Sequence, residues 1–199
     1  WPALASRRAS AMVSFTARCC REWERVHRGV GYEIGCGPPR CATCLIALEE
    51  FEGVARRFEV RAEVGGVVLV DDYGHHPTEI AAVFATAREV FDRRLVVVFQ
   101  PHRYSRTKAL AREFAEVLKD AGLVVLADIY AAGERPIAGV SADLIVDALR
   151  LISPREVVRV HGREDAPGVV AALLQPGDLL LTVGAGDVSR WGEEILGLY

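Results

Sequence analysis

Residues 99–107 read FQPHRYSRT, and they set a histidine, two arginines and three hydroxyl groups in one short segment. A guanidinium makes two parallel charge-assisted hydrogen bonds to a carboxylate or a phosphate, and an imidazole adds a further donor or acceptor. The apolar run LVVVF (95–99) leads directly into these side chains and predicts a buried strand. A rigid element would therefore present several hydrogen-bond donors together, which is the chemistry needed to hold a small anion locally.

Three further polar motifs also follow apolar runs that have the length of strands. They are DDYGHHP (71–77), YAAGE (130–134) and GAGD (184–187). In a parallel α/β sheet the carboxyl ends of the strands meet at one edge, and ligand sites lie beyond that edge. Chance would spread polar residues over both edges, so we expect these motifs and FQPHRYSRT to form a single site.

The elements that must position these motifs alternate regularly along the chain. Gly65 and Gly66 predict a turn that joins the first two strands in a hairpin. Continuous apolar strands that alternate with amphipathic helices predict an α/β fold with a doubly wound, mostly parallel sheet and an N-terminal hairpin strand. The sequence predicts strands at 56–63, 67–70, 95–99, 123–130, 157–160 and 178–184, and helices at 77–91, 107–120, 141–150, 166–174 and from near Val188.

The size and charge of the chain exclude some classes of protein. With 199 residues, of which 51% are hydrophobic, the chain is long enough to bury a substantial core. A formal net charge of −3 gives no overall positive field, so we predict no nucleic-acid partner. The apolar runs are shorter than the roughly 20 residues that span a bilayer. Because no signal-peptide pattern opens the sequence, we expect a cytoplasmic protein with no membrane partner.

The first 44 residues differ from the rest of the chain. They contain all five cysteines, and they show neither helical nor strand periodicity. Cys41 and Cys44 have the spacing of half a zinc site, to which Cys36 or His27 would have to add ligands. No second matching pair follows, so we predict no metal site, and disulfides are rare in cytoplasmic proteins. We expect residues 1–44 to be an irregular segment, either disordered or non-native.

The polar motifs carry a resemblance when they are taken together and in order. GVARRF (53–58), DDYGHHPTEI (71–80), FQPHRYSRT, DIYAAGE (128–134) and the final GAGD are similar to the C-terminal domain of the Mur ligases. The resemblance covers residues 45–199 and implies a Rossmann-like domain. Within the family, the type that joins L-alanine to UDP-N-acetylmuramate resembles the sequence most. The type that recycles murein tripeptide shares DD-x-x-HHPT but lacks the HRYSR pattern.

The resemblance implies an ATP-dependent amide ligation in peptidoglycan synthesis. The muramyl carboxylate is phosphorylated by ATP, the amine of L-alanine attacks the acyl phosphate, and ADP and phosphate leave. Members of the family have three domains: one binds the UDP-sugar, a central one carries the phosphate loop, and the C-terminal one closes over ATP and presents the amino acid. The implied cofactor is ATP, with Mg²⁺ held mainly by the central domain, and the implied substrates are UDP-N-acetylmuramate and L-alanine.

The resemblance also implies two groups of site residues. Arg57 matches the arginine that reaches the ATP phosphates, and Arg57 and Asp72 are the implied catalytic residues. Arg103 and Arg106 match the pair that holds the carboxylate of the incoming alanine, a role that suits a guanidinium fork. The implied nucleotide-binding residues are Arg57, Asp72, Tyr73 and His75, and the implied substrate-binding residues are His102, Arg103, Arg106 and Tyr130.

Structural roles remain open for some of these positions. Arg106 could be a surface arginine at the start of a helix. Asp71 or His76 could orient the turn that they belong to, or cap the helix that follows.

The sequence also departs from the family pattern. It contains no G-x-x-x-x-G-K-[ST] phosphate loop, and the Asn-rich helix expected before GVARRF is missing. The irregular segment stands in place of this helix. A coding segment read in a shifted frame would produce such a segment. Two hypotheses follow: the chain is the C-terminal domain of the ligase and inactive alone, or it is a non-catalytic module that binds a nucleotide or a carboxylate. The upstream DNA would distinguish them, because a phosphate loop in another frame supports the first.

Overall fold

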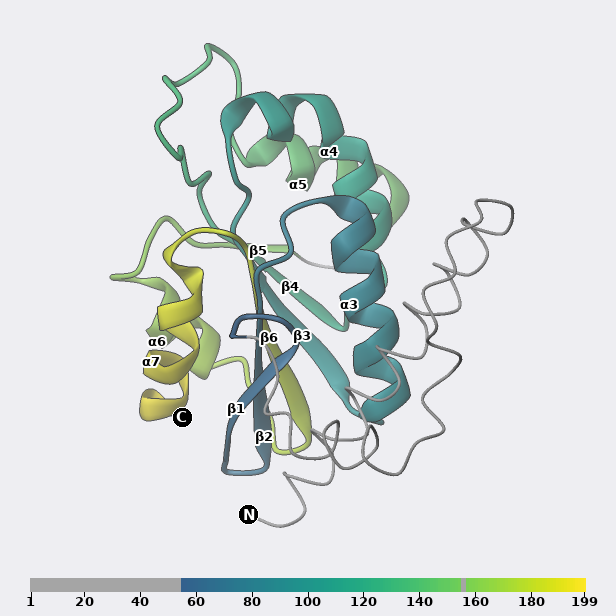
Figure 1. Ribbon diagram of the computed structural model, residues 1–199, viewed down its shortest axis with the longest axis vertical. Helices are drawn as coiled ribbons and strands as arrows, with labels where there is room; N and C mark the ends of the chain where they lie inside the picture. Colours follow the sequence, from purple (N-terminus) through teal and green to yellow (C-terminus); the bar gives the residue numbers. More distant parts are fainter. Residues whose placement is uncertain (1–54, 155–156) are drawn as a thin grey trace, which may run out of the picture. The chain divides into compact units, whose positions relative to one another are not determined.

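The order of the strands brings the last strand of the chain into the middle of the sheet (Figure 1). The computed structural model describes residues 55–154 and 157–199, and six strands in this part form one sheet in the order β1-β2-β6-β3-β4-β5. Because β6 lies between β2 and β3, the loop after β6 is flanked by the loops after its two neighbours. The strands are β1 (Glu59–Val64), β2 (Val67–Asp72), β3 (Arg94–Phe99), β4 (Leu123–Leu126), β5 (Val157–Arg159) and β6 (Asp178–Val183).

The pairing of the strands confirms the predicted fold class. β1 and β2 form an antiparallel hairpin, and the remaining four pairings are parallel. Gly65 and Gly66 make the hairpin turn with φ values of 57° and 83°, which favour glycine. Every residue of β2 and β6 is buried, as expected for strands that are covered on both faces.

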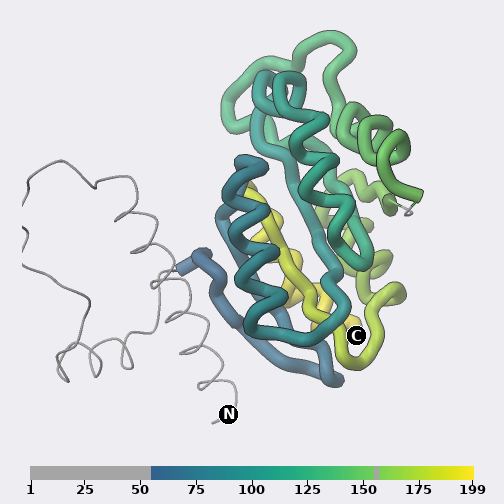
Figure 2. The backbone as a smooth tube through the Cα atoms, turned by 90° about the vertical axis from the view of Figure 1, so that its right-hand side faces the viewer, coloured from purple at the N-terminus to yellow at the C-terminus, as the bar shows by residue number. Residues whose placement is uncertain are grey.

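Helices cover both faces of the sheet. Figures 1 and 2 show α3, α4 and α5 on one face and α6 and α7 on the other. On the first face, the ring of Phe114 packs 5.1 Å from the ring of Phe99. On the second, Trp191 and Ile195 join the core formed with Leu69. The helices are α3 (Pro77–Val90), α4 (Tyr104–Leu118), α5 (Asp143–Ile152), α6 (Ala166–Ala171) and α7 (Trp191–Leu198), the last preceded by a 3-10 turn, η1 (Asp187–Arg190).

Element boundaries at the polar edge differ from the prediction, most clearly around the FQPHRYSRT motif. β4 ends at Leu126 instead of residue 130, and a single bridge between His102 and Tyr130 continues its parallel course. α4 begins at Tyr104 instead of residue 107, so part of the FQPHRYSRT motif is helical. The cause is tertiary, because a carboxylate from another loop, Glu134, accepts hydrogen bonds from Ser105 in the first turn of α4.

Some predictions lie outside the described residues. They are the irregular character of residues 1–44, the boundary after residue 44 and the half zinc site at Cys41 and Cys44. The described residues belong to one compact unit, Ala55–Tyr199. Among them, none of the helices has the length and apolar character needed to cross a membrane.

Candidate functional site

Backbone hydrogen bonds join the polar motifs at the carboxyl edge of the sheet. Gly184 N–H donates to Asp72 O at 3.1 Å, and Gln100 N–H donates to Val183 O at 3.0 Å. Farther along the same edge, the N–H of Tyr130 donates to the carbonyl of Pro101 at 2.8 Å. The prediction that these motifs meet at one edge is therefore confirmed.

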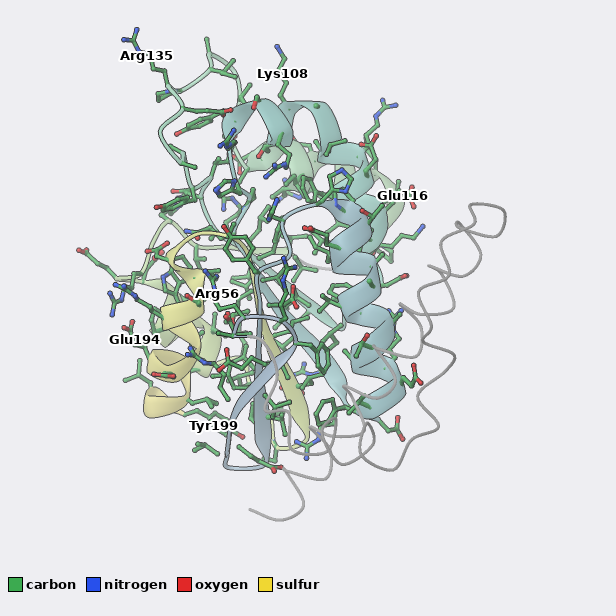
Figure 3. All side chains as sticks on the ribbon, in the orientation of Figure 1. Arg56, Lys108, Glu116, Arg135, Glu194 and Tyr199 are labelled. Atoms are coloured by element: carbon green, nitrogen blue, oxygen red, sulfur yellow. The ribbon has the colours of Figure 1, made fainter. Side chains whose placement is uncertain are left out.

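Arg56 fixes the loop before β1 to this edge. Its Nε donates to Asp71 Oδ2 at 3.1 Å, and its Nη2 donates to Gly184 O at 2.6 Å. Asp71 is fully buried and also accepts from Thr182 Oγ1 at 2.7 Å. This arrangement supports the structural role for Asp71. Figure 3 shows Arg56 within the molecule, whereas Arg135 and Lys108 project outward from its upper end. Sequence reasoning gave Arg56 no role, because nothing local distinguishes it from the adjacent Arg57.

Arg57, in contrast, is exposed and faces the site. Its guanidinium carbon lies 5.7 Å from the centroid of the Tyr73 ring, and that of Arg56 lies 4.9 Å from it. Within residues 55–154 and 157–199, the Arg57 side chain has no hydrogen-bonding partner, so its donors are available for an anion. An exposed guanidinium beside an aromatic ring suits a phosphate group and a flat base.

The Asp72 carboxylate is occupied by backbone amides. Phe58 N–H donates to Oδ2 at 2.8 Å and Gly74 N–H donates to Oδ1 at 2.7 Å. Asp72 is only 4% exposed, and burial raises the pKa of its carboxyl, although both amides and the Arg57 charge act in the opposite direction. Asp72 therefore ties the loop before β1 to the turn that carries Tyr73.

We expect Asp72→Asn to lower the stability of the domain by about 1–2 kcal/mol, because an amide offers one acceptor oxygen to the two N–H groups that the carboxylate now satisfies. Thermal unfolding of the variant and of a surface control, Asp92→Asn, measures this effect. A complete ligase carrying Asp72→Asn that keeps its stability but loses kcat would instead show that Asp72 acts on the nucleotide.

Glu79 and His76 organise the start of α3. Glu79 Oε2 accepts from the N–H groups of His75 and His76 at 2.9 and 3.1 Å, and His76 Nδ1 accepts from Thr78 N–H at 3.4 Å. This reciprocal arrangement is a capping box with histidine as the N-cap residue. The geometry supports the structural role for His76. The His75 ring lies beside this cap, with Nδ1 3.2 Å from Tyr73 O and 3.7 Å from Glu79 Oε2.

Four aromatic side chains form a continuous row along the edge, which we call the ring row: Tyr73, His75, His102 and Tyr130. Successive ring centroids are 5.6, 5.6 and 5.8 Å apart, and the last two rings are stacked at 19°. Gly186 passes close to the final ring, because a Cβ there would lie 2.8 Å from Tyr130 Cγ and 2.2 Å from Gln100 Oε1. The second glycine of the GAGD motif thus leaves room for the Tyr130 end of the ring row.

His102 is held by Arg106 in its neutral form. Arg106 Nη1 donates to His102 Nδ1 at 3.2 Å and to His102 O at 3.4 Å. Because Nδ1 accepts, the ring proton is on Nε2. Burial lowers the pKa of His102 below its usual range, and the charges of Arg106, His75 and Arg103 lower it further. His102 can therefore donate one hydrogen bond from Nε2 at neutral pH.

We expect an NMR titration to give His102 a pKa below about 6.5, the usual value. The neutral ring then contributes stability above that pH, and the contribution is lost as the pH falls through the lower folded-state pKa. Arg106→Met should move the pKa back toward the usual value. Lys108→Met, which removes an exposed cation from the same helix, should not, and equal shifts in both variants would contradict the specific effect of Arg106.

Arg103 stands at the start of α4 in an unusual backbone conformation. Its φ is 73°, which costs a non-glycine residue about 1–3 kcal/mol and persists only where the surroundings impose it. Here Arg103 N–H donates to Tyr130 O at 2.9 Å, and Arg103 O accepts from Thr107 N–H at 3.1 Å. The Arg103 side chain is exposed. The structure therefore brings Arg103, Arg106 and His102 together around the first turn of α4.

Comparisons with known proteins identify the family of this domain. The described residues form a doubly wound α/β domain with a donor-rich carboxyl edge. The family model "Mur ligase, glutamate ligase domain" matches residues 56–186. The chain therefore belongs to the Mur ligase family.

Curated relatives with the name UDP-N-acetylmuramate–L-alanine ligase are similar to the C-terminal part of the chain. The Anaeromyxobacter sp. protein is 50% identical over 152 residues, which cover 76% of this chain and 33% of the relative. The Nitratidesulfovibrio vulgaris protein is 48% identical over 166 residues, which cover 83% and 36%. The chain thus spans about a third of the length of these relatives.

Solved structures share the fold. The UDP-N-acetylmuramate-alanine ligase MurC of Thermotoga maritima superposes with a TM-score of 0.65 at 29% identity, covering 87% of this chain and 35% of that one. A murein peptide ligase of Psychrobacter arcticus has a TM-score of 0.60 at 20% identity, covering 78% and 32%, which shows the fold alone. The resemblance to the alanine-adding type is confirmed by the curated relatives.

Proposed function

We propose that this chain carries the C-terminal domain of an ATP-dependent ligase that joins L-alanine to UDP-N-acetylmuramate in peptidoglycan synthesis. The observation that carries the proposal is the pair of guanidiniums, Arg103 and Arg106, beside the neutral His102. They lie at the same sheet edge as Arg57, whose side chain has no hydrogen-bonding partner among residues 55–154 and 157–199. The identity of about half to alanine-adding relatives supports the substrate.

The amino-acid end of the site is built for a carboxylate. Arg103 and Arg106 supply charge-assisted hydrogen bonds, and His102 Nε2–H adds a neutral donor. Tyr130 stacks on His102 and fixes the plane of its ring. Holding the carboxylate of L-alanine in this way leaves its amine free to attack an activated acyl group.

The other end of the ring row has the residues that suit ATP. The Arg57 guanidinium has donors available for phosphate oxygens, and Tyr73 and His75 present rings beside it. Asp72 positions their turn through its bonds to Phe58 and Gly74. ATP, when bound, supplies the phosphoryl group that activates the muramyl carboxylate. In the described residues, no group of three or more histidine, cysteine or acidic side chains could hold a metal ion. We expect Mg²⁺ to be held mainly by the central domain of the ligase.

For this role we expect a cytoplasmic protein that supports cell-wall biogenesis, cell shape and division. A second hypothesis remains, in which the chain is a non-catalytic module that binds a nucleotide or a carboxylate. The two hypotheses differ in whether the domain supports catalysis when the remaining domains are supplied.

The chain alone should form no UDP-N-acetylmuramyl-alanine, because the phosphate loop and the UDP-sugar site belong to other domains. Residues 55–199, grafted onto the first two domains of the Nitratidesulfovibrio vulgaris relative in place of its own C-terminal part, should restore product formation. Mass spectrometry of the nucleotide product measures both results.

A graft with Arg103→Ala and Arg106→Ala together is the matched control and should be inactive. Product from the isolated chain would contradict its dependence on other domains. A folded graft that binds L-alanine and ATP but forms no product would favour the non-catalytic module.

A further inference from the structure

The first turn of α4 is stabilised from outside the helix. Arg103, the N-cap residue, makes no side-chain capping bond, and the first turn contains no acidic residue. Glu134, in the loop after β4, accepts from Ser105 N–H at 3.1 Å with Oε2 and from Ser105 Oγ–H at 2.5 Å with Oε1. A carboxylate at a helix N-terminus pairs with free N–H groups and interacts favourably with the helix dipole.

The loop that carries Glu134 is itself held in place. Glu134 N–H donates to Ala131 O at 3.0 Å, closing a turn in which Ala132 and Gly133 have φ values of 49° and 83°. At the start of the same loop, Tyr130 O accepts from the N–H of Arg103. The loop therefore contacts the start of α4 twice, at the backbone of Arg103 and at Ser105.

Glu134 also supplies negative charge to a strongly positive region. Its bonds with the Ser105 hydroxyl and the Ser105 amide lower the pKa of its carboxyl, and the charge of Arg103 adds to this effect. The same carboxylate partly offsets the other charges that act on His102. Glu134 is thus ionised at neutral pH and limits the repulsion between Arg103, Arg106 and any proton on His102.

We propose that Glu134 is a positioning residue for the amino-acid carboxylate, an inference that rests on the proposed function. Glu134 acts through Ser105: it holds the first turn of α4 and so sets the directions from which Arg103 and Arg106 approach the ligand. Its own carboxylate is engaged by Ser105, so the contact with the amino-acid carboxylate is left to the guanidiniums. Loss of Glu134 should therefore weaken binding of the amino acid and leave the nucleotide end unchanged.

Titration of L-alanine into the 199-residue chain tests this role, with the signals of the arginine Nε–Hε groups and of the amides of residues 102–107 followed by NMR. Glu134→Ala should raise the Kd for L-alanine about tenfold, the loss expected for one charge-assisted interaction. Glu134→Gln keeps an acceptor for Ser105 and should raise it only about threefold. The Kd for ADP, titrated in the same way, should stay the same in both variants.

The controls separate the route through Ser105 from a general effect of charge. As a single substitution, Ser105→Ala should weaken alanine binding. In the Glu134→Ala background it should cause little further loss of affinity, because the effects of coupled residues are not additive. Glu113→Ala removes an exposed carboxylate from the same helix and should change nothing. Unchanged alanine affinity in Glu134→Ala would overturn the role of Glu134, and additive effects would overturn the route through Ser105. A wild-type chain with no saturable alanine shifts would instead contradict the proposed function and, with it, this inference.

Discussion

Arg57→Ala should lower kcat about 100- to 1000-fold in a complete ligase that carries this domain, the loss typical of removing one preorganised donor. The side chain is exposed, its guanidinium carbon lies 5.7 Å from the Tyr73 ring centroid, and no other residue of the described part of the chain accepts its hydrogen bonds. Negative charge on the transferring group increases toward the transition state, so the loss should appear in kcat while the KM for alanine stays unchanged. Steady-state kinetics with each substrate varied in turn measures this result.

The control for Arg57 is Arg150→Ala, which removes an exposed arginine from α5. Its ion pair with Asp147 is 3.7 Å long and exposed, so the variant should keep full activity. Arg56 is not a suitable control, because its loss would leave the buried Asp71 without its cation. A normal kcat with a raised KM for ATP in Arg57→Ala would show that Arg57 binds the ground state only.

Arg106→Lys should raise the KM for alanine about 10- to 100-fold, because losing one charge-assisted hydrogen bond costs roughly 1.5–3 kcal/mol. Lysine keeps the positive charge but has no planar fork. It also loses the geometry with which Arg106 donates to His102 Nδ1 and His102 O, so the neutral donor beside it becomes less fixed. The KM for ATP should change little, in contrast to the effect of Arg57→Ala on kcat.

Arg112→Lys is the matched control for this prediction. Arg112 is an exposed arginine on the same helix, between one and two turns farther along, and the substitution should leave both KM values unchanged. Equal increases in the KM for alanine and for ATP in Arg106→Lys would remove Arg106 from the carboxylate site. His102→Gln provides a second check, because it should raise the KM for alanine and leave the KM for ATP, which binds at the Arg57 end, unchanged.

Much of the site could be predicted because polar motifs follow apolar strands. The strands that end at Asp72 and Phe99 were identified from their apolar runs, and the rule for parallel sheets brought their loops to one edge. Their neighbour β6 was also identified, but not its place between them. Local sequence contains no information on strand order, since the pairing of β6 with β2 and β3 depends on contacts over more than 80 residues.

By itself, the sequence determined the fold class, the N-terminal hairpin and the identity of the polar loops, because these depend on periodicity and on residue types next to one another. Only the tertiary structure decided which of two adjacent arginines is engaged with Asp71 and which remains available. It also decided that Asp72 bonds to backbone amides. The carboxylate of Glu134, distant in sequence, extends α4 into the arginine motif. Each of these outcomes depends on which donors and acceptors meet at the sheet edge, and that is set only when the strands have assembled.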